Sequence, residues 1–175
     1  MMTLHRTTVD SPVGELTLFA SDAGLRAVLW PGPDDSRVVL GDDDLVDDPD
    51  HPVLRAATAQ LAEYFAGDRS TFDLPLDPIG TPFQQKSWDV LRTIPYGTTI
   101  TYGEQAKRLG SPNAFRAVGA ANGRNPISII VPCHRVVGSD GSLTGFGGGL
   151  GAKAWLLEHE SGEPALPGLG RPARI

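Results

Sequence analysis

The sequence predicts a mixed α/β protein, in which a small N-terminal β-sheet with one helix precedes a mostly helical C-terminal domain containing a helix-turn-helix. Three observations support this fold class. Alternating apolar residues mark strands near the N-terminus, paired helix-start signals follow residue 80, and charge divides the chain. Residues 1–80 carry 5 Lys+Arg against 15 Asp+Glu, a net charge of −10, whereas residues 81–160 carry 8 against 5, a net charge of +3.

The first strands form a predicted β-hairpin. In residues 14–21, Leu16, Leu18 and Ala20 alternate on one face, "SDAG" at 21–24 supplies a turn, and residues 25–30 return. The acidic stretch 41–50, "GDDDLVDDPD", is interpreted as a solvated loop.

A helix follows Asp50 and is closed by Gly67. Its apolar residues recur with helical spacing at Leu54, Ala57, Leu61, Tyr64 and Phe65. The Pro- and Gly-bearing connector at 74–82 then places a domain boundary near residue 80.

Helices dominate the second half. Thr81–Gln84 is a capping box that opens a helix from Pro82 to about Thr93, and Thr101–Glu104 opens a short helix that ends at Gly110. Ser111-Pro112 starts another helix, which runs to Gly123. Two short helices joined by a Gly-Ser-Pro turn indicate a helix-turn-helix, although this pattern taken alone also fits a helical hairpin that binds nothing.

The only cysteine follows a predicted apolar strand, Ile127–Val131. Residues 138–151 form a Gly-rich loop without the pattern of a phosphate-binding loop, and residues 152–160 form a last amphipathic helix. The tail, residues 161–175, is rich in Pro and Gly, so we expect it to be disordered.

Composition excludes several classes of protein. A hydrophobic fraction of 40% with 21% charged residues is typical of a soluble globular protein, and no apolar run is long enough for a membrane span. One cysteine cannot form an intramolecular disulfide or a multi-cysteine zinc site. Residues 1–16 lack a charged head followed by a long apolar segment, so we expect no secretory signal and a cytoplasmic protein.

Cys133 has two interpretations. Most lone cysteines are small buried hydrophobes. Against this, His134 and Arg135 could stabilise a thiolate, which is a nucleophile. In a regular strand Cys133 and His134 would point to opposite faces, so activation by His134 requires the chain to leave strand geometry or a water to bridge the two groups.

Three motifs carry a resemblance to a known family. In chain order they are "RAVGAANGRNP" at 116–126, "PCHRV" at 132–136 and "GFGGGLGAKAWLLEHE" at 145–160. Residues 81–160 resemble the O6-alkylguanine-DNA alkyltransferase family, and the first half fits that family's N-terminal domain more loosely. The resemblance implies DNA repair by direct damage reversal, in which an alkyl group moves irreversibly from O6-alkylguanine, and from O4-alkylthymine, in duplex DNA to Cys133. It also implies base flipping, a single turnover, no cofactor, and a monomer able to cluster on DNA.

The resemblance assigns roles to residues. Cys133 is the acceptor, His134 its base through a water, and Glu160 the carboxylate that orients His134. Tyr102 and Lys153 assist departure of guanine, and Asn125 is the hinge between the recognition helix and the active-site strand. The residues expected to contact DNA are Arg116, Ala117, Tyr102 and Arg135. The expected base pocket comprises Val131, Pro132, Phe146, Gly147 and Gly148.

The sequence departs from the family at Phe146 and Gly147, where many members carry tyrosine and serine. This puts tolerance of bulky alkyl groups in doubt. Some relatives bind zinc through N-terminal cysteines, which this chain lacks, so we expect no metal. The alternative functions are a non-catalytic alkylated-DNA lesion-binding protein, which would not need Cys133, and a cysteine hydrolase using Cys133 with His134 or His159 and Glu160, which would turn over.

Overall fold

The computed structural model describes residues 3–32, 38–41, 43–143, 146 and 148–162. The chain divides into two compact units. Of the described residues, those within 3–79 and 126–128 fall in the first, the sheet unit, and those within 80–125 and 129–162 fall in the second, the helical unit. The mixed α/β class predicted from the sequence is confirmed.

A four-stranded sheet in the order β3-β2-β1-β4 forms the sheet unit. The predicted hairpin is present as β2 (Leu16–Ser21) and β3 (Gly24–Leu29), which pair antiparallel. A further strand, β1 (Thr3–Val9), was not predicted from the sequence and pairs antiparallel with β2. Both faces of β2 are covered, so five of its six residues are buried and its alternating pattern understates its burial.

The acidic stretch 41–50 is not simply a loop, because residues 44–47 within it form β4 (Asp44–Asp47), parallel to β1 at the edge of the sheet. All four residues of β4 are exposed. Charged side chains on an edge strand discourage pairing with another chain.

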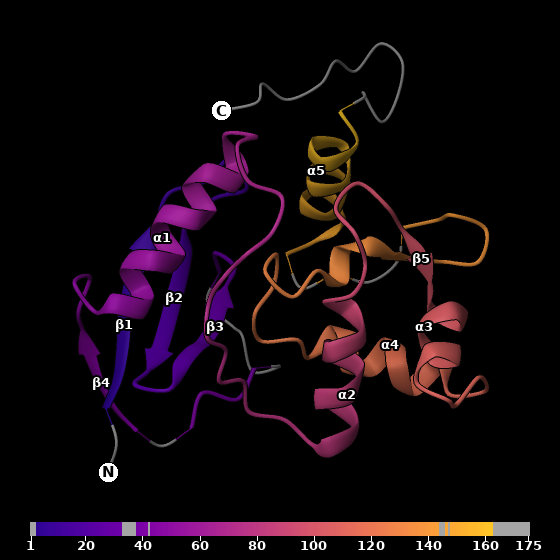
Figure 1. Ribbon diagram of the computed structural model, residues 1–175, viewed down its shortest axis with the longest axis horizontal. Coiled ribbons are helices and arrows are strands. Elements are labelled where there is room, and N and C mark those ends of the chain that lie inside the picture. The colour runs from indigo at the N-terminus through magenta and orange to yellow at the C-terminus, as the bar shows by residue number, and fades with distance from the viewer. Residues whose placement is uncertain (1–2, 33–37, 42, 144–145, 147, 163–175) are drawn as a thin grey trace. The chain divides into compact units, whose positions relative to one another are not determined.

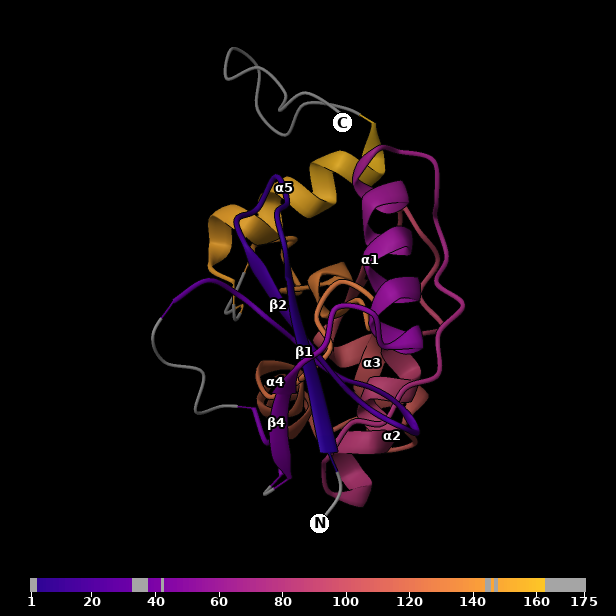
Figure 2. The same ribbon diagram turned by 90° about the vertical axis from the view of Figure 1, so that its left-hand side faces the viewer.

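Helix α1 (Pro52–Phe65) packs against β1, β2 and β3 (Figures 1 and 2). It buries the five apolar residues that the sequence identified: Leu54, Ala57, Leu61, Tyr64 and Phe65. Its N-cap is His51 and not Asp50, and a ring nitrogen of His51 accepts a hydrogen bond from the Val53 N–H. A second apolar cluster, Leu4, Phe19 and Ala27, is covered by Leu29, Val38 and Leu40.

The helical unit contains α2 (Pro82–Leu91), α3 (Tyr102–Arg108), α4 (Phe115–Gly123) and α5 (Leu150–Ser161) (Figure 1). Thr81 and Gln84 form the predicted capping box of α2. Helix α4 starts at Phe115, later than predicted, because residues 111–114 form a turn closed by a 2.9 Å bond from the Ala114 N–H to the Ser111 carbonyl.

Helices α2, α3 and α4 pack together around buried polar side chains. The Gln105 and Asn122 amides exchange two hydrogen bonds of 2.9 and 2.8 Å, and Trp88 Nε1 donates to the Ala121 carbonyl at 2.9 Å. Because buried amides are costly unless paired, these contacts fix the relative position of the two helices of the helix-turn-helix.

The predicted strand Ile127–Val131 is wrong. Ile127 makes a single parallel bridge to Val28 in the sheet unit, and residues 128–131 turn. Ile129 has a φ of 76°, an unusual conformation for a β-branched residue. The chain then forms a short 3-10 helix, η1 (Cys133–Arg135), followed by β6 (Val136–Val137), which pairs parallel with β5 (Ile100–Thr101).

Helix α5 includes Ser161, and Gly162 caps it with a φ of 77°, so the helix extends into the stretch expected to be a disordered tail. Residues 163–175 of that tail lie outside the described residues. Within the part of the chain that the structure describes, no helix combines the length and apolar character needed to cross a bilayer.

Candidate active site

Cys133 begins η1 in the helical unit and is 7% exposed. Pro132 before it has φ −84° and ψ 66°, the geometry of an inverse γ-turn, and the Cys133 N–H donates to the Val131 carbonyl at 2.8 Å. The chain therefore leaves strand geometry at the thiol. Activation of Cys133 by His134 was expected to require this departure from strand geometry or a bridging water.

The Val131 carbonyl accepts a second hydrogen bond, at 2.8 Å, from Nδ2 of Asn125. Asn125 lies just beyond the end of α4, and its own N–H donates to the Asn122 carbonyl. Asn125 is 3% exposed and thus forms a buried link between the end of α4 and the turn before Cys133.

His134 is completely buried, and its Nε2 lies 2.7 Å from Oε2 of Glu160 on α5. A carboxylate at this distance accepts a hydrogen bond from the Nε2–H group, so the ring proton lies on Nε2 and a lone pair is left on Nδ1. Among the described residues, Nδ1 of His134 has no hydrogen-bond partner. The Glu160 carboxylate thus fixes the tautomer in which Nδ1 is a base.

Arg135 supports the same carboxylate. Its Nε donates to Oε1 of Glu160 at 2.8 Å and one terminal nitrogen donates to Oε2 at 3.0 Å, a two-pronged contact. The other terminal nitrogen donates to the Ile94 carbonyl at 2.7 Å, and the guanidinium lies 5.7 Å from the centre of the Tyr96 ring. The guanidinium therefore faces the interior of the helical unit, contrary to the expectation that Arg135 contacts DNA.

Burial alone would raise the pKa of Glu160, but its contacts with His134 and Arg135 hold that pKa well below its ordinary value. The Gly97 N–H lies 3.5 Å from Oε1 and adds a weak donor. Glu160 is consequently a carboxylate that stays ionised in a buried position.

Lys153 of α5 is completely buried, and its Nζ donates to the Val136 carbonyl at 2.7 Å. Burial lowers the pKa of Lys153, while electrostatic attraction to the Cys133 thiolate partly restores it. Nζ also lies 5.9 Å from the centre of the Tyr102 ring. The structure thus places Lys153 near both Cys133 and Tyr102, the residues that the family resemblance assigns to one site.

Arg116 and Ala117 are exposed on the first turn of α4, beside Phe115, which is 51% exposed. Val131 and Pro132 are buried, and Phe146 and Gly148 are partly buried. Gly147 lies outside the described residues.

Sequence reasoning missed the supporting contacts around Glu160. Gly97 and Ile94 contribute main-chain groups, which no side-chain motif reveals. The inward direction of Arg135 depends on η1, and a strand had been predicted just before it.

Comparisons with known proteins cover both units. A family model described as "6-O-methylguanine DNA methyltransferase, DNA binding domain" matches residues 82–162, and one described as "6-O-methylguanine DNA methyltransferase, ribonuclease-like domain" matches residues 4–78.

Named relatives match over most of their length. A methylated-DNA–protein-cysteine methyltransferase of Mycobacterium bovis is 48% identical over 90% of this chain and 92% of its own. The enzyme of the same name from Methanosarcina acetivorans is 46% identical, over 90% of this chain and 98% of its own length. The crystal structure of Mycobacterium tuberculosis OGT in complex with DNA has a TM-score of 0.79 at 48% identity, covering 90% of this chain and 93% of that one.

Proposed function

Because this chain belongs to the 6-O-methylguanine DNA methyltransferase family, we propose that it repairs alkylated DNA by moving an alkyl group from O6 of guanine to Sγ of Cys133. The observation that carries this proposal is the buried Cys133 beside a histidine whose tautomer is fixed by an ionised glutamate. The activity is transfer of a methyl group from methylated DNA to a cysteine of the protein itself.

The first step is loss of the thiol proton. Nδ1 of His134 accepts it through a bridging water, and the resulting imidazolium is stabilised by Glu160 at 2.7 Å. Arg135 keeps the Glu160 carboxylate in place with its two-pronged contact. The ammonium of Lys153 stabilises the thiolate electrostatically.

The thiolate then attacks the alkyl carbon. An S–C bond forms as the C–O6 bond breaks, and the electron pair of that bond moves onto guanine. Tyr102, with Lys153 beside its ring, donates a proton or a hydrogen bond to the departing base. The product is a thioether, which has no carbonyl for water to attack, so each chain reacts once.

The base must leave the duplex stack to reach a buried thiol. We propose that α4 meets the DNA, that Arg116 fills the space left by the flipped nucleotide, and that Ala117 allows close approach. The exposed first turn of α4 and the net charge of +3 on residues 81–160 favour this interface. Val131, Pro132, Phe146 and Gly148 are the proposed pocket for O6-alkylguanine and, by the same chemistry, O4-alkylthymine.

Asn125 is a positioning residue in this scheme. Its side chain ties the turn before Cys133 to the end of α4, so displacement of α4 against DNA would be transmitted to the thiol.

Intact-protein mass after incubation with one equivalent of duplex containing a single O6-methylguanine tests the proposal. We expect a gain of one methyl group per chain, mapped to the peptide containing Cys133 and absent from Cys133→Ala. Tight lesion-specific binding without any mass gain would instead indicate a lesion-binding protein, and continued turnover would indicate a hydrolase.

A second experiment tests base flipping. Arg116→Ala should slow reaction with duplex DNA at least tenfold and leave reaction with free O6-alkylguanine unchanged. Equal losses on both substrates would show that Arg116 has no role in flipping.

A further inference from the structure

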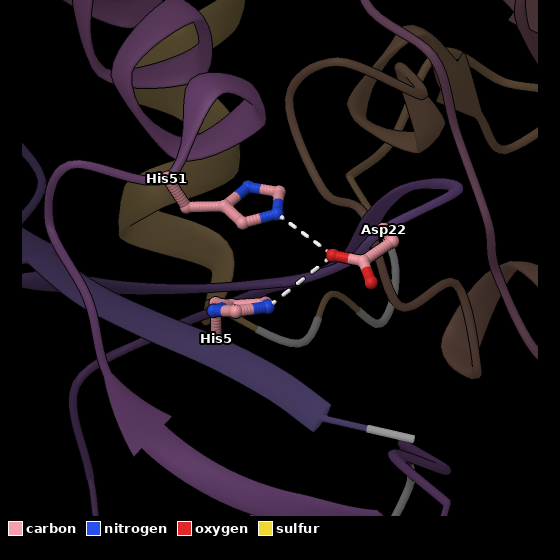
Figure 3. Close-up of side chains that lie close together, drawn as sticks. All are labelled: His5, Asp22 and His51. Atoms are coloured by element: carbon pink, nitrogen blue, oxygen red, sulfur yellow. Dashed lines mark hydrogen bonds and ion pairs between the residues drawn. The ribbon is translucent and has the colours of Figure 1, made fainter.

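We propose that His5, Asp22 and His51 of the sheet unit form a binding site for a divalent zinc-like cation. The three residues lie on separate segments: His5 on β1, Asp22 in the turn between β2 and β3, and His51 at the N-cap of α1. Figure 3 shows a nitrogen of each imidazole directed at the same carboxylate oxygen of Asp22. The alkyl transfer proposed above uses none of them.

The distances between the potential ligand atoms suit a tetrahedral ion. Nε2 of His5 lies 3.4 Å from Oδ1 of Asp22, and Nε2 of His51 lies 3.3 Å from the same oxygen. Ligands about 2.0–2.1 Å from a tetrahedral zinc ion lie roughly 3.3–3.4 Å apart. All three ligand atoms lie within 4.8 Å of one another, so small side-chain rotations suffice to surround one ion.

Asp48 supplies a supporting contact that metal-binding histidines commonly have. Its Oδ2 lies 3.0 Å from Nδ1 of His5 and is placed to accept a hydrogen bond from the Nδ1–H group. This leaves a lone pair on Nε2, facing Asp22. A carboxylate behind a histidine fixes the ring and the tautomer needed for coordination.

Charge also favours a cation here. Asp22 and Asp48 bring two carboxylates to two imidazoles. With neutral imidazoles the group carries two negative charges, which a divalent ion balances. Two imidazoles and one carboxylate form a donor set typical of zinc sites that keep a position open for water. The Asp22 side chain is 73% exposed, so an ion can enter directly from solvent.

His51 couples metal binding to the hydrogen bond that caps α1. Its Nδ1 accepts the Val53 N–H at 3.2 Å, so without metal the ring proton lies on Nε2. Coordination through Nε2 moves the proton to Nδ1 and ends this cap bond. Metal binding should therefore shift the Val53 amide resonance.

The expectation of no metal considered cysteine ligands only. The ligands proposed here are histidine and aspartate. A bound ion would join β1, the β2–β3 turn and the start of α1, so we expect it to stabilise the sheet unit.

The test uses untagged full-length Cys133→Ala, in which a smaller side chain replaces the buried cysteine and no thiol competes for metal. After dialysis against chelator, zinc is titrated by calorimetry and cobalt by visible absorption. We expect one zinc per chain, d–d bands typical of tetrahedral cobalt, and a rise in Tm of roughly 5 °C at 100-fold excess over Kd.

Asp22→Asn and His5→Gln, each in the Cys133→Ala chain, should lose the cobalt spectrum, and Asp48→Asn should weaken zinc binding about tenfold. Asp44→Asn removes another exposed carboxylate of the sheet unit and should bind like the parent. No zinc bound at 100 µM, or unchanged binding by Asp22→Asn, would overturn the proposal. Neither outcome depends on alkyl transfer, because the parent of this series has no acceptor thiol.

Discussion

Two groups of histidine and carboxylate side chains differ in the exposure of the carboxylate. The Glu160 side chain is 1% exposed and is held by His134 and Arg135, whereas the Asp22 side chain is 73% exposed and forms ion pairs with His5 and His51. Burial with a permanent cation keeps a carboxylate ionised and its histidine in one tautomer. Exposure without such a cation leaves the carboxylate available to an ion from solvent.

This difference in exposure predicts that substitutions at Glu160 lower the stability of the protein more than substitutions at Asp22. In a poorly solvated interior, removing one partner of an ion pair leaves the other charge uncompensated. At the surface, water replaces the lost partner. The variants below test this contrast, beginning with the largest expected effect.

Glu160→Gln should slow alkyl transfer at least about 100-fold, because glutamine cannot stabilise an imidazolium at His134. Single-turnover kinetics on O6-methylguanine duplex measure the effect. Thermal melting monitors the loss of stability, which should be about 3–5 kcal/mol, since the Arg135 guanidinium loses its buried counter-charge.

Glu158→Gln is the matched control. Glu158 is also on α5 and 8% exposed, and its Oε1 has no hydrogen-bond partner among the described residues. It should react at close to the parent rate. A Glu160→Gln rate within threefold of the parent would remove Glu160 from the proposed chemistry.

Arg135→Lys comes next. Lysine keeps the charge but cannot form the two-pronged contact with Glu160, so we expect about a tenfold slower reaction with both duplex DNA and free base. DNA affinity and its salt dependence should not change. If the salt slope instead falls by about one and the free-base reaction is normal, Arg135 contacts phosphate, as the sequence first indicated.

The Arg135 case shows where sequence reasoning reached its limit. The family resemblance assigned Cys133, His134, Glu160 and Lys153 to one site, and the structure places His134 beside Glu160 and Lys153 within electrostatic reach of Cys133. The side-chain direction of Arg135 depends on η1, which follows a segment of four apolar residues with no helical signal. An arginine beside a reactive cysteine fits a DNA contact and an internal support equally well.

The same limit applies to the fold. Capping boxes and prolines located α2 and α3 because these signals are local. Strands β1 and β4 were missed because each depends on pairing with distant residues and not on its own pattern. The His5–Asp22–His51 group could not be predicted either, because its members are brought together only by the sheet and the start of α1.

Acid should remove the stability that the Glu160 carboxylate contributes. The pKa of Glu160 is lowered in the folded chain, so the stability it contributes is complete above the unfolded value of about 4.3 and is lost as pH falls further toward the folded value. Stability should therefore fall steeply below about pH 4.3 in the parent and less steeply in Glu160→Gln. Urea unfolding between pH 3 and 7 measures both slopes. Parallel curves would show that Glu160 does not set the acid sensitivity.

Asp22→Asn should have the smallest effect. With chelator present, its free energy of unfolding should change by less than about 0.5 kcal/mol, since an exposed carboxylate exchanges histidine contacts for water at little cost. Urea unfolding at pH 7 measures this, with Asp44→Asn as the reference. A loss above about 1 kcal/mol would mean that Asp22 already stabilises the sheet unit as a hydrogen-bond acceptor.

With zinc, the parent should gain stability and Asp22→Asn should not. A difference between the two chains that appears only with metal identifies the ion, and not the hydrogen bonds, as the stabilising partner.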